Sequence, residues 1–165
     1  IHLNFYGINI EEKIKEIIKT KFPELKNYIS YFPKLSNQKL LESIASKNVL
    51  LLFNYFYSTG TKIYEYMALK KCIIMCYSEE MPEDSSLIPY FNEKPEGIST
   101  NKQADLINET NSGIVVRDSK HLLEVLTELY QEFSQTGKIK CDSTNTESYS
   151  RKKQAEMFTK IINNK

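Results

Sequence analysis

Two unbroken apolar stretches, "NVLLLF" at 48–53 and "CIIMCY" at 72–77, constrain the fold of this chain most strongly. A continuous apolar run is typical of a strand that is covered on both faces by helices in a parallel sheet. The segment between the two runs, "STGTKIYEYMALKK" at 58–71, has a helix-like pattern after a glycine-containing turn. Strand, helix and buried strand in this order predict a parallel βαβ unit.

The same alternation continues along the rest of the chain. Apolar residues recur at helical spacing after a first strand at 1–6, Ser36 is placed to cap a second helix, and Asp118 begins a long one. We therefore predict a Rossmann-like, doubly wound parallel α/β sheet of five or six strands, in which 48–53 and 72–77 are central. An extra C-terminal helix at 149–163 should pack outside this repeat. The other expected elements are strands at 28–32 and 113–116 and a short helix near 102–110.

One segment is too long for an ordinary connection between a strand and a helix. Residues 78–101 contain six acidic residues and three prolines, with the apolar island "LIPYF" among them. We expect this segment to be a lid, or a loop that becomes ordered when a ligand binds, and to be mobile without ligand.

Composition excludes several classes of function. The chain of 165 residues suits one domain, and its formal charge of +1 gives no global field for nucleic acid. Three cysteines form neither a disulfide framework nor a zinc motif, and Cys72 and Cys76 are interpreted as small apolar core residues. This use of cysteine fits a reducing cytosol, so we expect a cytoplasmic protein. No apolar run approaches the roughly 20 residues of a membrane span, so we also expect the chain to be soluble.

The turn before the 58–71 helix has the chemistry of a phosphate site. In open α/β sheets, ligands bind beyond the carboxyl ends of the strands, where helix N-termini present free N–H groups. Gly60 would let the backbone approach a phosphate, Ser58 and Thr61 offer hydroxyls, and Lys62 offers a charge. Glu65 suits a ribose diol, because a carboxylate accepts two hydrogen bonds. Alternatively, the turn is a solvated cap in which Glu65 pairs with Lys62 or with Lys70.

The stretch "TKIYEYMALKKCII" resembles the C-terminal donor-binding domain of retaining GT-B glycosyltransferases of family 4 type. Three further segments are similar to that family in the same order: "YFPKLSNQKLLESIASKNVLLLF", "ADLINETNSGIVVRDSKHLLEVLTELY" and "YSRKKQAEMFTKII". The resemblance covers nearly all 165 residues. It implies the C-terminal half of a GT-B fold, with an N-terminal acceptor domain and a diphosphate-gripping basic pair upstream of Ile1.

The resemblance also implies roles for particular residues. Glu65 matches the glutamate at the donor ribose, and Gly60 matches a glycine near the diphosphate. Pro33, Lys34 and Leu35 match the loop that lines the base, although a plain turn would need no function there. The chain departs from the family at Tyr57, which stands in place of a glutamate at the transferred sugar, and at Ser58, which replaces a glycine.

These matches lead to an expected function. The chain would be the donor-binding part of an enzyme that transfers a sugar from a nucleotide diphosphate sugar with retention, without a metal or other cofactor. Its partners would be the donor and the acceptor domain, and the full enzyme could associate with the inner face of a membrane. The chain alone should be inactive. Because Tyr57 replaces the sugar-contacting glutamate, a catalytically silent nucleotide or sugar-phosphate binding module remains the alternative.

Overall fold

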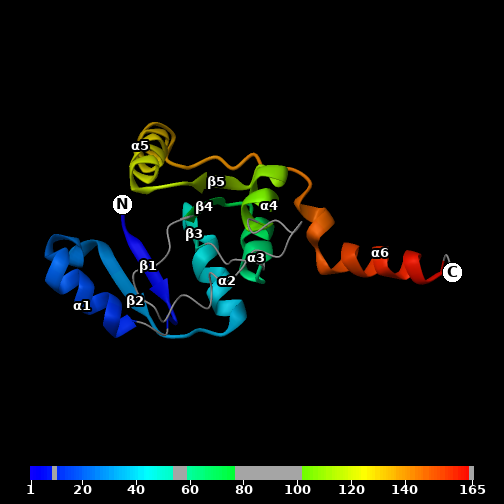
Figure 1. Ribbon diagram of the computed structural model, residues 1–165, viewed down its shortest axis with the longest axis horizontal. Helices are drawn as coiled ribbons and strands as arrows, with labels where there is room; N and C mark the ends of the chain where they lie inside the picture. The colour runs from blue at the N-terminus through cyan, green and yellow to red at the C-terminus, as the bar shows by residue number, and fades with distance from the viewer. Residues whose placement is uncertain (9–10, 54–58, 77–101, 164–165) are drawn as a thin grey trace, which may run out of the picture. The chain divides into compact units, whose positions relative to one another are not determined.

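The computed structural model describes residues 1–8, 11–53, 59–76 and 102–163 of the 165 (Figure 1). The chain divides into two compact units, Ile1–Ser46 and Lys47–Lys165. The predicted lid at 78–101 and the predicted sugar-site residues Tyr57 and Ser58 lie outside the described residues.

The first unit is built around two parallel strands. Strand β1 pairs with β2 in the register Leu3↔Ile29 to Tyr6↔Phe32. Two aromatic pairs stack across these strands, Phe5 on Tyr31 and Tyr6 on Phe32, with ring centroids 5.7 and 4.8 Å apart. The elements of the unit are β1 (Leu3–Tyr6), α1 (Glu11–Lys21), the 3-10 helix η1 (Pro23–Tyr28), β2 (Ile29–Phe32) and α2 (Asn37–Ala45).

The second unit contains a three-stranded parallel sheet in the order β3-β4-β5. Strands and helices alternate along it, as the apolar pattern predicts. A 3-10 helix and a last α-helix then follow the long helix α5. The elements are β3 (Val49–Phe53), α3 (Lys62–Ala68), β4 (Cys72–Cys76), α4 (Lys102–Thr110), β5 (Gly113–Val116), α5 (Ser119–Thr136), η3 (Thr146–Tyr149) and α6 (Arg151–Asn163).

The central strand β4 separates two apolar clusters. Ile73 and Met75 point into one cluster, together with side chains of α3 and α4. Cys72 and Ile74 point into the other, which α5 covers. Ile73, Ile74 and Met75 are fully buried, and each such side chain contributes about 1.5–3 kcal/mol of transfer free energy. The prediction that helices cover both faces of this strand is confirmed.

The expected single sheet of five or six strands is not what the structure describes. Its described strands form separate sheets of two and three strands, smaller than a full Rossmann sheet. The central position is confirmed for β4, but β3 lies at the edge of its sheet. The edge strand β3 is less buried than β4: Leu50 and Leu52 on one face are buried, Val49 and Leu51 are half-buried against the cluster under α5, and Phe53 is 62% exposed. An unbroken apolar run therefore did not require a central position in the sheet.

Two helix caps confirm the boundaries expected from the sequence. The Ser36 hydroxyl accepts a hydrogen bond from the backbone N–H of Lys39 at the start of α2. The Asp118 carboxylate accepts one from the N–H of His121 at 2.8 Å. This backbone hydrogen bond lowers the pKa of Asp118 because it favours the ionised form.

Candidate functional site

The turn before α3 contains a glycine in a left-handed backbone conformation. Gly60 has a φ of +61°, in the left-handed region that favours glycine. Among the described residues, no atom lies within 4 Å of a Cβ built at this position, so this part of the chain leaves the turn open on that side. A ligand could therefore approach the backbone here without displacing side chains that the structure describes.

Helix α3 holds Glu65 beside the open turn. Its inner face is fixed by Ile63 and Met67, which are 0% and 1% exposed. Thr61 stands at the N-cap but makes no side-chain capping hydrogen bond, and both Thr61 and Lys62 are exposed. Glu65 lies in the first turn and is half-buried. The hydroxyl of Thr61, the charge of Lys62 and the carboxylate of Glu65 thus belong to one short segment.

The ion pairs expected from the alternative interpretation are not formed. Within the described ranges, Glu65 makes no ion pair with Lys62 or Lys70, and Lys70 instead lies 3.5 Å from the Glu147 carboxylate. The Glu65 charge is nevertheless felt locally. Burial, and then the nearby Glu65 carboxylate, raise the pKa of Tyr66. Glu65 is thus a half-buried carboxyl group that forms no ion pair within the described part of the chain.

A side chain of helix α4 fixes the backbone of the turn before α3. The Gln103 side-chain amide donates a hydrogen bond of 3.0 Å to the carbonyl oxygen of Thr59, and Gln103 is 3% exposed. The Thr59 hydroxyl also lies 3.1 Å from the Tyr64 hydroxyl. Sequence reasoning missed these positioning residues, because a glutamine in an amphipathic helix carries no signal of which distant carbonyl it will meet.

The proposed base loop lies in the first unit. Pro33 and Lys34 are exposed and Leu35 is half-buried, between β2 and α2. Gly7 holds the loop closely: its N–H donates to the Phe32 carbonyl at 2.9 Å, and a Cβ on it would come within 2.9 Å of Lys34 Cα. The loop is thus an ordered, exposed turn.

The structure gathers part of the predicted site. Gly60, Thr61, Lys62 and Glu65 lie together on one turn and helix of the second unit. Pro33, Lys34 and Leu35 belong to the other unit.

Other candidate residues have structural surroundings. His2 contacts the Ser30 hydroxyl at 2.8 Å, and the His121 ring accepts a hydrogen bond from the Arg117 N–H. Cys72 is buried in the core, where desolvation raises the pKa of its thiol to about 11. Cys76 packs half-buried against the same cluster, as expected of an apolar core residue.

The described part of the chain shows no metal-binding group of three or more His, Cys, Asp or Glu residues. None of the helices in it is long and apolar enough to cross a membrane. Fold and site together define an α/β protein with parallel strands and an open glycine turn before a helix. No protein family, curated protein or solved structure matches the chain in sequence or structure comparisons.

Proposed function

We propose that the chain is the donor-binding domain of a retaining GT-B glycosyltransferase, which transfers a sugar from a nucleotide diphosphate sugar. The observation that carries this proposal is the half-buried Glu65, which forms no ion pair with the described residues and lies one helical turn from the open glycine at Gly60. A carboxylate in such a place can accept hydrogen bonds from both hydroxyls of a ribose.

The neighbouring groups suit the rest of a nucleotide diphosphate. The backbone around Gly60 can approach the diphosphate, and the Thr61 hydroxyl and the Lys62 ammonium can donate hydrogen bonds to its oxygens. These groups would also stabilise the charge that builds on the leaving diphosphate during transfer, so the proposal needs no metal ion. Ser58 and Tyr57 would complete the site toward the sugar.

The position of the turn supports the same proposal. It follows strand β3, and ligands of parallel α/β sheets bind beyond the carboxyl ends of the strands. In the proposed doubly wound domain, the loop at Pro33, Lys34 and Leu35 would lie along the base through its backbone groups. The acceptor would be held by a separate N-terminal domain, so the chain alone should bind donor weakly and transfer nothing.

Calorimetric titration of uridine, guanosine and adenosine diphosphates against Glu65→Ala tests the proposal. The variant should lose roughly ten- to hundred-fold in affinity, because hydrogen bonds to a charged acceptor are worth about 1.5–3 kcal/mol. Thermal stability should change little, since Glu65 lies on a helix rim with no described ion pair to lose. Glu124→Ala, which removes an exposed carboxylate from α5, is the matched control and should bind as the parent does.

A 2′-deoxynucleotide separates a ribose contact from a general effect of charge. It should bind the parent less well than the ribonucleotide does, yet lose little more in Glu65→Ala, because its partner is already gone. Equal nucleotide affinities for the parent and Glu65→Ala would contradict the ribose role. Nucleotide binding without sugar transfer in the full-length protein would instead favour the silent binding module, which Tyr57 suggests.

A further inference from the structure

Polar contacts join the open glycine turn to the C-terminal part of the second unit. Gln103 and Glu109 stand near the two ends of helix α4. Gln103 donates its hydrogen bond to the carbonyl oxygen of Thr59, the residue directly before Gly60. Glu109 accepts a hydrogen bond of 2.6 Å from the Tyr149 hydroxyl. One helix therefore holds both the turn before α3 and a side chain of η3.

Tyr64 of α3 closes these contacts into a network. Its hydroxyl lies 3.1 Å from the Thr59 hydroxyl, and its ring stacks on the Tyr149 ring with centroids 6.4 Å apart. Both rings pack against the apolar cluster of α3 and α4. The residues of this Thr59 network are Thr59, Tyr64, Gln103, Glu109 and Tyr149. A displacement of Tyr149 would therefore reach the turn through Tyr64 and also through α4.

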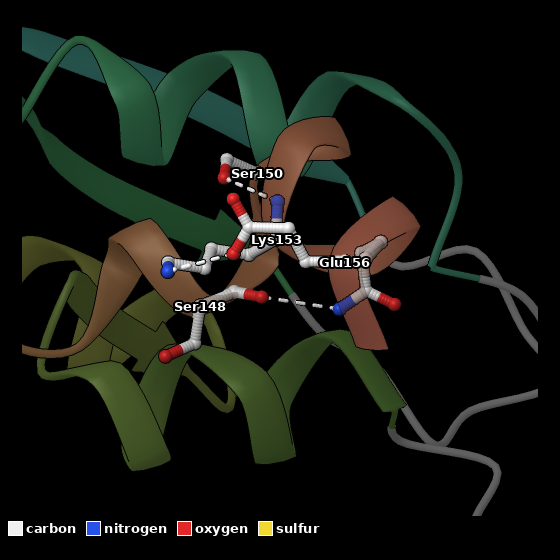
Figure 2. A network of polar contacts seen from close by, with 5 residues as sticks. Ser148, Ser150, Lys153 and Glu156 are labelled. Atoms are coloured by element: carbon white, nitrogen blue, oxygen red, sulfur yellow. Dashed lines mark hydrogen bonds and ion pairs between the residues drawn. The ribbon is translucent and has the colours of Figure 1, made fainter. Parts of the chain in front are cut away.

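The backbone on both sides of Tyr149 is held in place. Figure 2 shows the junction of η3 and α6, where these hydrogen bonds lie. The Gln154 side-chain amide donates to the Ser148 carbonyl at 3.1 Å. The Lys153 N–H donates to the Ser150 hydroxyl at 3.3 Å. The first turn of α6 thus fixes the position from which Tyr149 reaches the Thr59 network.

The Thr59 network supports a turn that is entropically costly to order. Gly60 has a φ of +61°, and glycine loses more backbone freedom on folding than any other residue. The Thr61 side chain makes no capping hydrogen bond at the start of α3. Gln103 is 3% exposed, so breaking its bond to Thr59 would leave a desolvated amide without that partner. The network thus favours one conformation of the turn.

We infer that the Thr59 network holds the glycine turn in its nucleotide-binding conformation, so that η3 and the start of α6 control nucleotide affinity. Gln103, Tyr64 and Tyr149 are then positioning residues. A turn that is ordered in advance loses less freedom when the ligand binds, and this pre-organisation strengthens binding. The inference rests on the proposed nucleotide diphosphate site and adds to it a dependence on the C-terminal segment.

Nucleotide titration of two Gln103 variants tests the contact with the turn. Gln103→Leu removes the donor and should bind nucleoside diphosphates about threefold to tenfold less tightly, the factor that one hydrogen bond contributes. In Gln103→Glu the side chain can donate to the Thr59 carbonyl only when it is protonated, and burial favours that neutral form. Affinity relative to the parent should therefore recover in Gln103→Glu as pH falls from about 7.5 to about 5.5, but not in Gln103→Leu.

Two Tyr149 variants test the remote contact. Tyr149→Phe keeps the ring and loses the bond to Glu109, so affinity should fall about twofold. Tyr149→Leu also loses the stacking on Tyr64 and should fall about threefold to tenfold. Tyr130→Leu replaces an exposed tyrosine of α5 and should bind as the parent does. Val125→Ala lowers stability through the other apolar cluster and should also keep the parent's affinity.

The backbone of the turn can also be measured without ligand. NMR order parameters of Gly60 and Thr61 should fall from about 0.85 toward about 0.6 in Gln103→Leu and in Tyr149→Leu. In the parent, added nucleotide should slow amide hydrogen exchange at Lys153, because coupling between two sites is reciprocal. Far-UV circular dichroism verifies that each variant is folded.

The possible failures of the inference and of the proposed function can be told apart. Parent-like affinity in Gln103→Leu, together with weakened binding in Glu65→Ala, would overturn the inference and leave the proposed function standing. Unchanged order parameters at Gly60 in Tyr149→Leu would show that η3 does not hold the turn. Equal affinities for the parent and Glu65→Ala would remove the nucleotide site, while the order parameters would still decide whether the Thr59 network holds the turn.

Discussion

Different interactions stabilise each of the two compact units of this chain. Among the described residues of the first unit, Ile44 is the one buried hydrophobic side chain, whereas both apolar clusters belong entirely to the second unit. The first unit relies on half-buried aromatic rings, such as Phe5 on Tyr31 and Tyr6 on Phe32. The same kind of substitution should therefore change stability by different amounts in the buried apolar core of the second unit and among the stacked rings of the first.

The difference follows from strand number and composition. Two parallel strands cannot enclose a core, and stacked aromatic pairs add only about 0.5–1.5 kcal/mol each beyond the area that they bury. In the second unit, β4 presents Ile73 and Met75 on one face and Cys72 and Ile74 on the other, and all four are buried. We expect amides of β4 to exchange more slowly than those of β1, because exchange there requires the core to open.

The largest difference in stability between the two units is expected when one glycine of each is replaced by alanine. A Cβ at Gly113 would lie 2.0 Å from the carbonyl oxygen of Ile73, its register partner in the neighbouring strand, so β4 and β5 must separate to accept it. Gly113→Ala should lower the free energy of unfolding of the second unit by about 3 kcal/mol or more. Urea denaturation followed by far-UV circular dichroism measures the change.

Gly7→Ala makes the matched substitution in the first unit. There the Cβ would lie 2.9 Å from Lys34 Cα, in an exposed loop rather than in a sheet, although the φ of +60° adds strain. Gly7→Ala should lower the free energy of unfolding of the first unit by about 1–2 kcal/mol. It should leave amide hydrogen exchange in β4 unchanged. A Gly113→Ala protein as stable as Gly7→Ala would show that the second unit is not the more tightly packed one.

Removing one buried hydroxyl from each unit should change the free energy of unfolding by amounts that differ in sign or size. In the second unit, the fully buried Thr110 hydroxyl lies 2.7 Å from the Leu106 carbonyl and 2.9 Å from the Ser112 hydroxyl. Thr110→Val should destabilise the protein by about 1–3 kcal/mol, because it leaves buried polar groups without a partner. In the first unit, the buried Tyr31 hydroxyl has no hydrogen-bond partner in the part of the chain that the structure describes.

Tyr31→Phe should therefore be neutral, or stabilising by up to about 1 kcal/mol, since it removes a polar group that is desolvated without compensation. Thermal unfolding of both variants beside the parent measures the contrast. Destabilisation by Tyr31→Phe as large as that by Thr110→Val would mean that the Tyr31 hydroxyl has a partner after all, and the first unit would then resemble the second.

The alternation of elements could be read from the sequence because it depends on local patterns. The apolar run at Cys72–Cys76, the caps at Ser36 and Asp118, and the parallel pairing of β3 with β4 all follow from residue order. The sheets themselves could not be predicted in the same way. Which strand edges pair depends on contacts between distant segments, so the two separate sheets and the edge position of β3 were missed.

The candidate site divides along the same line. The glycine conformation at Gly60 and the place of Glu65 in the first turn of a helix were predictable, since both depend on neighbours in the chain. The bond from Gln103 to Thr59 joins residues 44 apart, and no periodicity encodes it. The pairing of Lys70 with Glu147 instead of Glu65 is likewise a tertiary contact.

The smallest expected effect comes from Lys15 on α1, which lies over the Tyr31 ring at 5.3 Å and pairs with Glu11 at 2.5 Å and Glu12 at 3.0 Å. Lys15→Met should destabilise the first unit only slightly, because exposed ion pairs are screened by water and salt.

Hydrogen bonds to Glu11 and then Glu12 raise the pKa of Lys15 above 10.5, so its contribution is present from neutral pH up to that value and is lost as pH rises through the raised pKa. The difference between Lys15→Met and the parent should therefore shrink in strong alkali and at high salt, while Lys19→Met, one turn along the helix, should match the parent throughout. A Lys15→Met deficit that persists at high salt and high pH would show that the charge of Lys15 does not account for its contribution, and the predicted weakness of these exposed contacts in the first unit would be wrong.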